Sequence, residues 1–186
     1  MSEKPSYLGL LNAISVAEAE AEEYLTCWAE TTTRDDVRQV LHTVALREGE
    51  HAKAFAKRIC ELGFAVRPST PNPERAAIAA SAGLSDKEKF EQLGLGTDPG
   101  DGPDIFAGMF NDPTIDIITG GLLGRYIAEE RDSGRMFRAC YQALCEEDAT
   151  AADHAASPSL ATINERLDRI EATLAALAPD HADSRL

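Results

Sequence analysis

Long parts of this chain repeat apolar residues every three or four positions, the spacing of one face of an α-helix. In residues 5–30 the stripe consists of Tyr7, Leu11, Ile14, Glu18, Ala21, Leu25 and Trp28. In residues 34–62 it consists of Val37, Leu41, Val44, Glu48, His51, Phe55 and Ile59. A short turn joins the two segments and Gly63 ends the second, so we expect two antiparallel helices that pack against each other.

A third periodic segment starts at Asp112-Pro113, where the proline suits the first position of a helix, and runs to about Cys145. One of its stripes contains Glu129 and consists of Ile115, Ile118, Leu122, Tyr126, Glu129, Ser133, Met136, Cys140 and Leu144. A competing stripe contains Glu130 and consists of Leu123, Ile127, Glu130, Phe137 and Tyr141. We favour Glu129 as the inward residue, but the pattern leaves the choice open.

Prolines and glycines interrupt residues 64–113, which predicts an irregular crossover. Within it, short helices are expected over residues 73–82 and 85–93, and Ser85 with Glu88 forms the signature of a capping box. This region shows no residues that indicate chemistry.

Residues 157–178 predict a last helix, which follows a polar linker over Glu146–Ala156. Its apolar positions keep the spacing of a coiled coil without a break: Leu160, Ile163, Leu167, Ile170, Leu174 and Leu177. This helix is expected either to pair with other copies of the chain or to pack on its own chain as a fourth bundle helix.

Charged residues within the apolar stripes are the candidate chemistry. Glu48 and His51 stand three residues apart, so both side chains project from one helix face. Glu18 lies about half-way along the first helix, as Glu48 does along the second, which brings them to similar heights. Burying a carboxylate and an imidazole is unfavourable unless something compensates them. The pattern therefore predicts a metal site with Glu18, Glu48, His51 and Glu129 as ligands.

Composition and charge narrow the class of protein. Hydrophobic residues make up 44% of the 186-residue chain, alanine is abundant and β-branched residues are not concentrated, which favours an all-α protein. The net charge of −14 repels nucleic acid and anionic membranes and attracts cations. No stretch approaches the roughly 20 apolar residues of a membrane span.

The cysteines and the first residues indicate the compartment. Cys27, Cys60, Cys140 and Cys145 form no C-x-x-C pair, which argues against a zinc ribbon or a rubredoxin-type iron site. They are expected to be buried thiols in a reducing cytoplasm. The first five residues lack the apolar core of a signal peptide, so a cytoplasmic location is expected.

With Glu18, Glu48-x-x-His51 and Glu129, the chain resembles the ferritin-like superfamily, and its rubrerythrin-like members most. The resemblance implies that residues 1–148 form a ferritin-like antiparallel helix bundle, holding two iron ions, or manganese, through bridging carboxylates. That family has a second Glu-x-x-His on a fourth helix, and none follows residue 129 here. Subunits could share the site, Glu130 or Asp132 could substitute, or the site could be mononuclear or vestigial.

Two hypotheses of function follow. The first is a non-haem iron or manganese protein of oxidase or peroxidase type, or one that handles iron. It is expected to react with O₂ or H₂O₂ and to form a homo-oligomer, a dimer or higher. The second is a metal-free or vestigial ferritin-like scaffold that oligomerises through its C-terminal helix. Metal content distinguishes them.

Overall fold

The computed structural model describes residues 4–97, 106–156 and 160–177. These residues form six α-helices and one 3₁₀ helix, with no strand among them, which confirms the all-α prediction for this part of the chain. The chain divides into two compact units, Met1–Cys145 and Glu146–Leu186.

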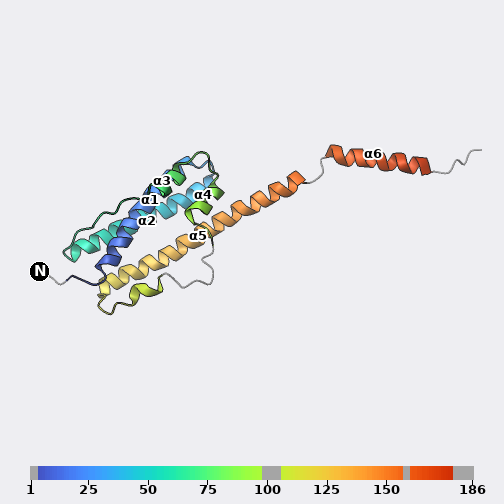
Figure 1. Ribbon diagram of the computed structural model, residues 1–186. Coiled ribbons are helices and arrows are strands. Elements are labelled where there is room, and N and C mark those ends of the chain that lie inside the picture. The colour runs from blue at the N-terminus through green and yellow to red at the C-terminus, as the bar shows by residue number, and fades with distance from the viewer. Residues whose placement is uncertain (1–3, 98–105, 157–159, 178–186) are drawn as a thin grey trace, which may run out of the picture. The chain divides into compact units, whose positions relative to one another are not determined.

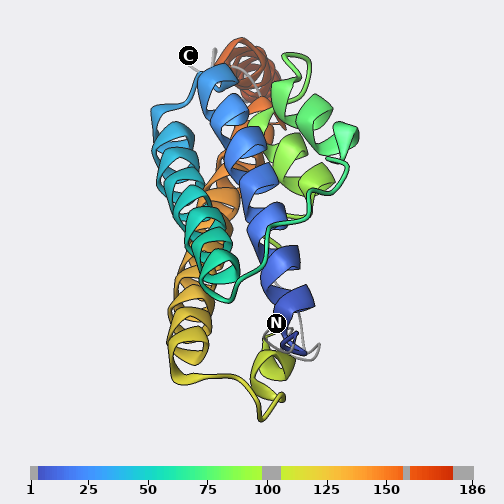
Figure 2. The ribbon, with the colours of Figure 1, turned by 90° about the vertical axis from the view of Figure 1, so that its left-hand side faces the viewer.

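Two long helices form the first hairpin of the Met1–Cys145 unit. Helix α1 spans Leu8–Thr31 and α2 spans Asp35–Glu61. A three-residue connection makes them antiparallel neighbours, and they lie side by side in both views (Figures 1 and 2). Helix α2 ends before Gly63, whose φ of 86° lies in the left-handed region that glycine adopts without a steric penalty.

Helix α5 (Ile117–Ala156) supplies the third long element of this unit through its residues up to Cys145. The Tyr7 hydroxyl donates to the Asp116 carboxylate (2.7 Å), which fixes the start of α5 beside the start of α1. Further along, Phe137 and Leu144 pack with Leu25. Helix α5 therefore runs parallel to α1 and antiparallel to α2.

The crossover contains α3 (Pro73–Ala80), α4 (Asp86–Leu93) and η1 (Ala107–Phe110). The capping box at Ser85 is present at the start of α4. Helices α3 and α4 lie beside α1 (Figure 2). The Phe90 ring of α4 packs edge to face against the Trp28 ring of α1, with ring centroids 4.8 Å apart. The buried Lys89 ammonium donates to the carbonyl of Ala79 (2.9 Å) and so ties α3 to α4.

The core consists of two apolar clusters stacked along the bundle. The Trp28 cluster contains Leu25, Trp28, Ala29, Val37, Leu41, Val44, Ala45, Ala79, Phe90, Phe137 and Leu144. The Phe55 cluster contains Tyr7, Leu8, Leu11, Ile14, Phe55, Ile59, Leu123, Tyr126 and Ile127. Each long helix passes from one cluster to the other, and the polar residues of interest lie on the stretches between them.

Helix α5 differs from its predicted bounds at both ends. It begins at Ile117, because the Asp116 carboxylate accepts from the backbone N–H of Ile118 and Thr119 (3.0 Å each) and caps the helix. Asp112-Pro113 forms a separate turn instead. The prediction of a linker over Glu146–Ala156 is wrong, because these residues continue α5. The segment is rich in alanine and contains no glycine or proline, which favours a helix.

Helix α6 (Leu160–Leu177) belongs to the Glu146–Leu186 unit, and residues 157–159 and 178 of the predicted helix lie outside the described residues. Leu167 and Ile170 of its stripe are 51% and 55% exposed. In the described part of the chain, no helix combines the length and apolar character required to cross a bilayer.

Candidate metal centre

Four side chains from three helices converge between the two apolar clusters. Glu18 comes from α1, Glu48 and His51 from successive turns of α2, and Glu130 from α5. Each offers one ligand atom, and these four atoms lie within 4.8 Å of one another. Glu18, Glu48 and His51 are only 7%, 4% and 3% exposed, so this acidic cluster is inside the bundle and not on its solvated surface.

Three atoms of this group lack a hydrogen-bond partner among the described residues although they are buried: Glu48 Oε2, His51 Nδ1 and Glu130 Oε1. They face one another, with Nδ1 3.5 Å from Glu48 Oε2 and 3.4 Å from Glu130 Oε1. Unpaired buried polar atoms are rare because each costs about 1–3 kcal/mol. Ligands at about 2.1 Å from a metal ion are about 3.4 Å apart in a tetrahedral arrangement. The three atoms thus have the spacing of metal ligands.

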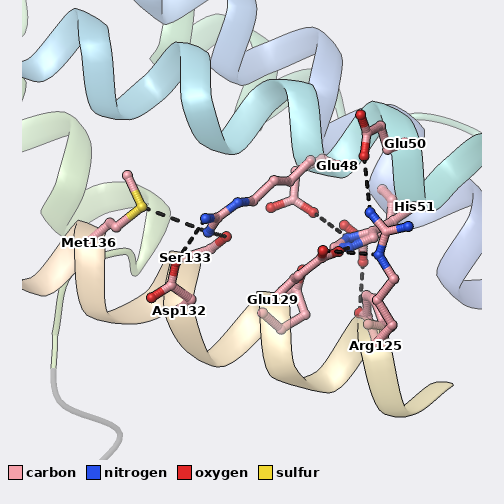
Figure 3. Close-up of polar contacts among 12 residues, drawn as sticks. Glu48, Glu50, His51, Arg125, Glu129, Asp132, Ser133 and Met136 are labelled. Carbon is pink, nitrogen blue, oxygen red and sulfur yellow. Dashed lines mark hydrogen bonds and ion pairs between the residues drawn. The ribbon is translucent and has the colours of Figure 1, made fainter. Parts of the chain in front are cut away.

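The other nitrogen of His51 is held by Glu129. His51 Nε2 lies 2.7 Å from Glu129 Oε2, on the opposite side of the ring from Glu48 and Glu130. Arg125 donates to Glu129 Oε1 (3.0 Å) and to Glu50 Oε2 (3.3 Å), which completes a chain of contacts between α2 and α5 (Figure 3). A carboxylate that accepts from one imidazole nitrogen leaves the other free for a metal, a common arrangement around metal-bound histidines.

The structure thus assigns different positions to the two adjacent glutamates of α5. Glu130, which the sequence pattern left as the alternative, is a member of the four-residue group, whereas the favoured Glu129 lies outside it, beyond the imidazole. Asp132, the other proposed substitute, pairs with Arg47 (2.8 Å) and Arg135 (2.9 Å) instead. Sequence reasoning did not single out Arg125 as a support for Glu129, although its spacing of four residues was a usable signal.

Tyr126 closes the group on the side of the Phe55 cluster. Its hydroxyl donates to Glu18 Oε1 (2.8 Å), and its ring meets the rings of His51 and Phe55 edge to face, at 5.0 and 5.3 Å. One oxygen of Glu18 is therefore occupied by a hydrogen bond. The ring also separates the carboxylates from the apolar residues below.

Burial and mutual repulsion retain protons in this group when no metal is bound. Burial, together with the nearby Glu48, raises the pKa of Glu18 to about 9, so that its carboxyl is protonated at neutral pH. Burial alone would lower the pKa of His51, but the carboxylates of Glu130, Glu48 and Glu129 raise it to about 10. Burial also raises the pKa of Glu130.

Glu48 is an ionised member of the group. Burial opposes its ionisation, but the proximity of His51 and Glu18 brings the pKa of Glu48 below its usual value. At neutral pH the metal-free cluster is thus a protonated imidazole beside an ionised Glu48, with a neutral Glu18. Protons occupy places that a cation would take.

The four cysteines are free thiols, but the expectation that they are buried is wrong: Cys60 is exposed and the other three are half-buried. Family models, curated proteins and solved structures were compared with this chain and none matches. Fold and site together define an all-helical protein with a buried cluster of carboxylates and one imidazole. The functional argument therefore rests on the geometry of these side chains.

Proposed function

We propose that this chain is a ferritin-like metal-binding protein that holds iron or manganese between α1, α2 and α5. Glu18, Glu48, His51 and Glu130 are the proposed ligands, and Glu129 is the residue that orients His51. The observation that supports this most strongly is the set of three buried atoms that lack a hydrogen-bond partner and face one another around His51 Nδ1. A cation would satisfy all three atoms at once.

The donor set favours iron or manganese. Carboxylate oxygens with one imidazole suit these ions, and thiolate ligands, which select softer metals, are absent from the group. A bound iron or manganese ion supplies redox chemistry and open positions for O₂ or H₂O₂. Four side chains provide for one ion, and a second would need bridging carboxylates with further ligands from water or another subunit.

The surrounding residues have distinct roles in this proposal. Glu129 accepts from His51 Nε2 and directs Nδ1 into the group, while Tyr126 donates to one oxygen of Glu18 and leaves the other for the metal. The Trp28 and Phe55 clusters lie above and below the site along the bundle. Glu18 and His51 each release a proton when they bind a cation.

Metal content tests this proposal. Protein purified without chelators and then loaded with Fe(II) or Mn(II) is expected to retain at least one ion per chain, and Glu18→Gln is expected to bind the ion about 100-fold more weakly or worse. Glu23→Gln, the same change at an exposed position of α1, is the matched control. Elemental analysis after gel filtration measures the ions retained. No retained iron or manganese in the wild type would overturn the proposal, and zinc alone would remove its redox part.

The alternative is a metal-free helical scaffold that assembles through α6. The exposed Leu167 and Ile170 favour self-association, because apolar residues at coiled-coil spacing are otherwise left in water. In this alternative the ion pair of His51 with Glu129 is a structural link between α2 and α5. Assembly through α6 is compatible with a metal centre, so we propose a homo-oligomer in either case.

The double substitution Leu167→Asp with Ile170→Asp is expected to dissociate that oligomer. Charges at these positions repel one another in any seam formed by copies of α6. Light scattering coupled to gel filtration should show a multiple of the 20.0 kDa chain mass for the wild type and 20.0 kDa for the variant. Thr173→Asp, on the same helix but outside the stripe, is the control. A wild type that elutes as a monomer would contradict the prediction.

A further inference from the structure

A cavity of about 280 Å³ adjoins the candidate metal centre. Glu18, Glu48 and Glu130 form part of its lining, so the carboxylates of the group open onto it. The remaining lining residues are mostly small or apolar: Ala17, Ala21, Tyr24, Leu25, Arg75, Leu95, Ser133, Gly134 and Phe137. The cavity therefore joins the buried acids to a largely apolar chamber.

The cavity opens to solvent, since Ala17 and Arg75 of its lining are exposed. Its space exists because Ala17, Ala21 and Gly134 are small, and larger side chains at these positions would fill it. A volume of 280 Å³ corresponds to about nine water molecules at liquid density. Such a space accommodates a molecule of about ten non-hydrogen atoms.

Arg75 gives the chamber its one positive charge among the described lining residues. Arg75 lies on α3 and is exposed, whereas the glutamates of the group are buried or half-buried. Arg75 therefore lies at the mouth of the cavity and the glutamates lie at its inner end. In the described part of the chain its guanidinium has no hydrogen bond or ion pair. A guanidinium without a partner at the mouth of a cavity is available to a ligand carboxylate.

Tyr24 lies close enough to Arg75 for the guanidinium charge to affect the pKa of the Tyr24 hydroxyl. Burial raises the pKa of Tyr24 to about 12, against the opposing effect of Arg75, so its hydroxyl remains a hydrogen-bond donor at neutral pH. Arg75 and Tyr24 both line the cavity, and both can donate to an anionic group. Leu25, Leu95 and Phe137 provide the apolar contacts.

We propose that this cavity binds a small organic monocarboxylate, with its carboxylate on the Arg75 guanidinium and its apolar body directed toward Glu48 and Glu130. A second negative charge on the ligand would approach three acidic residues, so a monoanion with an apolar body fits better than a dianion. The inference deepens the proposed function, because it names the substrate class that would reach the metal centre. The binding itself does not require the metal.

Benzoate, with nine non-hydrogen atoms, and its neutral isostere benzamide test this inference. Calorimetric titration of the metal-free and the zinc-loaded protein is expected to show benzoate bound at least tenfold more tightly than benzamide. Arg75→Gln should reduce benzoate binding to the level of benzamide, and Arg75→Lys should retain part of the preference. Arg67→Gln, an exposed arginine that does not line this cavity, is the control. Equal affinities for the two probes in the wild type, or an unchanged preference in Arg75→Gln, would overturn the inference.

A second variant shows where the probe binds. A Cβ added at Gly134 would meet only the end of the Arg138 side chain, at 3.4 Å, and a Cβ at Gly124 on the same helix would meet nothing within 4 Å. Gly134→Val is therefore expected to fold as Gly124→Val does, with the same melting temperature, but to bind benzoate at least tenfold more weakly. Equal benzoate binding by the two glycine variants would refute the cavity as the site.

The two proposals fail in different ways. A chain that binds benzoate through Arg75 but retains no metal refutes the metal centre and leaves the carboxylate site standing. A chain that retains iron or manganese but binds benzoate no better than benzamide refutes the carboxylate site alone.

Discussion

His51→Ala is expected to abolish metal retention and to lower the free energy of unfolding of the metal-free protein by about 3 kcal/mol at pH 7. The imidazole is 3% exposed and is the positive partner of Glu129, Glu48 and Glu130. Its removal leaves buried carboxylates without a counter-charge. The partial exposure of Glu129 keeps the loss at the lower end of the range for broken buried ion pairs.

The same substitution should weaken metal binding by more than about 100-fold, since loss of a residue that only supports a ligand already costs 10–100-fold. Urea unfolding of chelator-treated protein gives the stability term, and titration with Mn(II) gives the affinity. His42→Ala, at an exposed position of the same helix, is the control. Destabilisation without any change in manganese binding would identify His51 as a structural residue and exclude it from the ligands.

The level of the site along the bundle could be predicted from the sequence because it follows from helical periodicity. Glu18 and Glu48 each interrupt a stripe half-way along a helix, and a short connection between antiparallel helices brings equal distances from the turn to equal heights. The structure places both residues between the Trp28 and Phe55 clusters. Local spacing was sufficient because both helices are long and uninterrupted.

The choice between Glu129 and Glu130 could not be predicted in the same way. Adjacent residues on α5 head stripes of similar apolar character, and both stripes contribute residues to the bundle: Tyr126 on one, Leu123 and Ile127 on the other. Which glutamate joins the group depends on the rotation of α5 about its axis, which tertiary packing sets. In the structure both contact His51, from opposite sides of the ring.

The sequence predicted the two short crossover helices and the capping box at Ser85, but it could not predict the cavity or where these helices pack. The placement of α3 and α4 depends on Phe90 packing against Trp28 and on Lys89 reaching the carbonyl of Ala79, contacts between residues far apart in the chain. The sequence did not mark Arg75 as a functional residue, because its possible role depends on the three glutamates that line the same cavity. Those glutamates lie on other helices.

The stabilisation that metal gives this protein is expected to grow as pH rises from 6 to 9, because the two forms respond to pH in opposite directions. In the metal-free protein the pKa of Glu18 is raised from 4.5 to about 9 and that of His51 from 6.5 to about 10. Both groups hold protons in the folded state that the unfolded chain releases. Their contribution to stability is complete below the unfolded pKa values and is lost as pH rises toward the folded values.

Metal binding has the opposite dependence, because Glu18 and His51 must release these protons to become ligands. Affinity therefore increases with pH across the interval in which the metal-free protein weakens. The lowered pKa values of Glu48 and Glu129 act at acidic pH and do not reverse the sign in this interval. Melting temperatures of the manganese-loaded and chelator-treated protein should diverge steadily between pH 6 and 9.

Calorimetry in two buffers of different ionisation enthalpy should count about two protons released for each ion bound near pH 7. Glu18→Gln removes one of the two titrating groups while keeping an oxygen that accepts from Tyr126, so the stability of its metal-free form should depend less steeply on pH. A gap in melting temperature that stays constant or narrows with pH would show that these side chains are not the ligands. If manganese does not change the melting temperature at any pH, the protein behaves as the metal-free scaffold. In that case the protonated Glu18 and His51 connect α1, α2 and α5 without a cation.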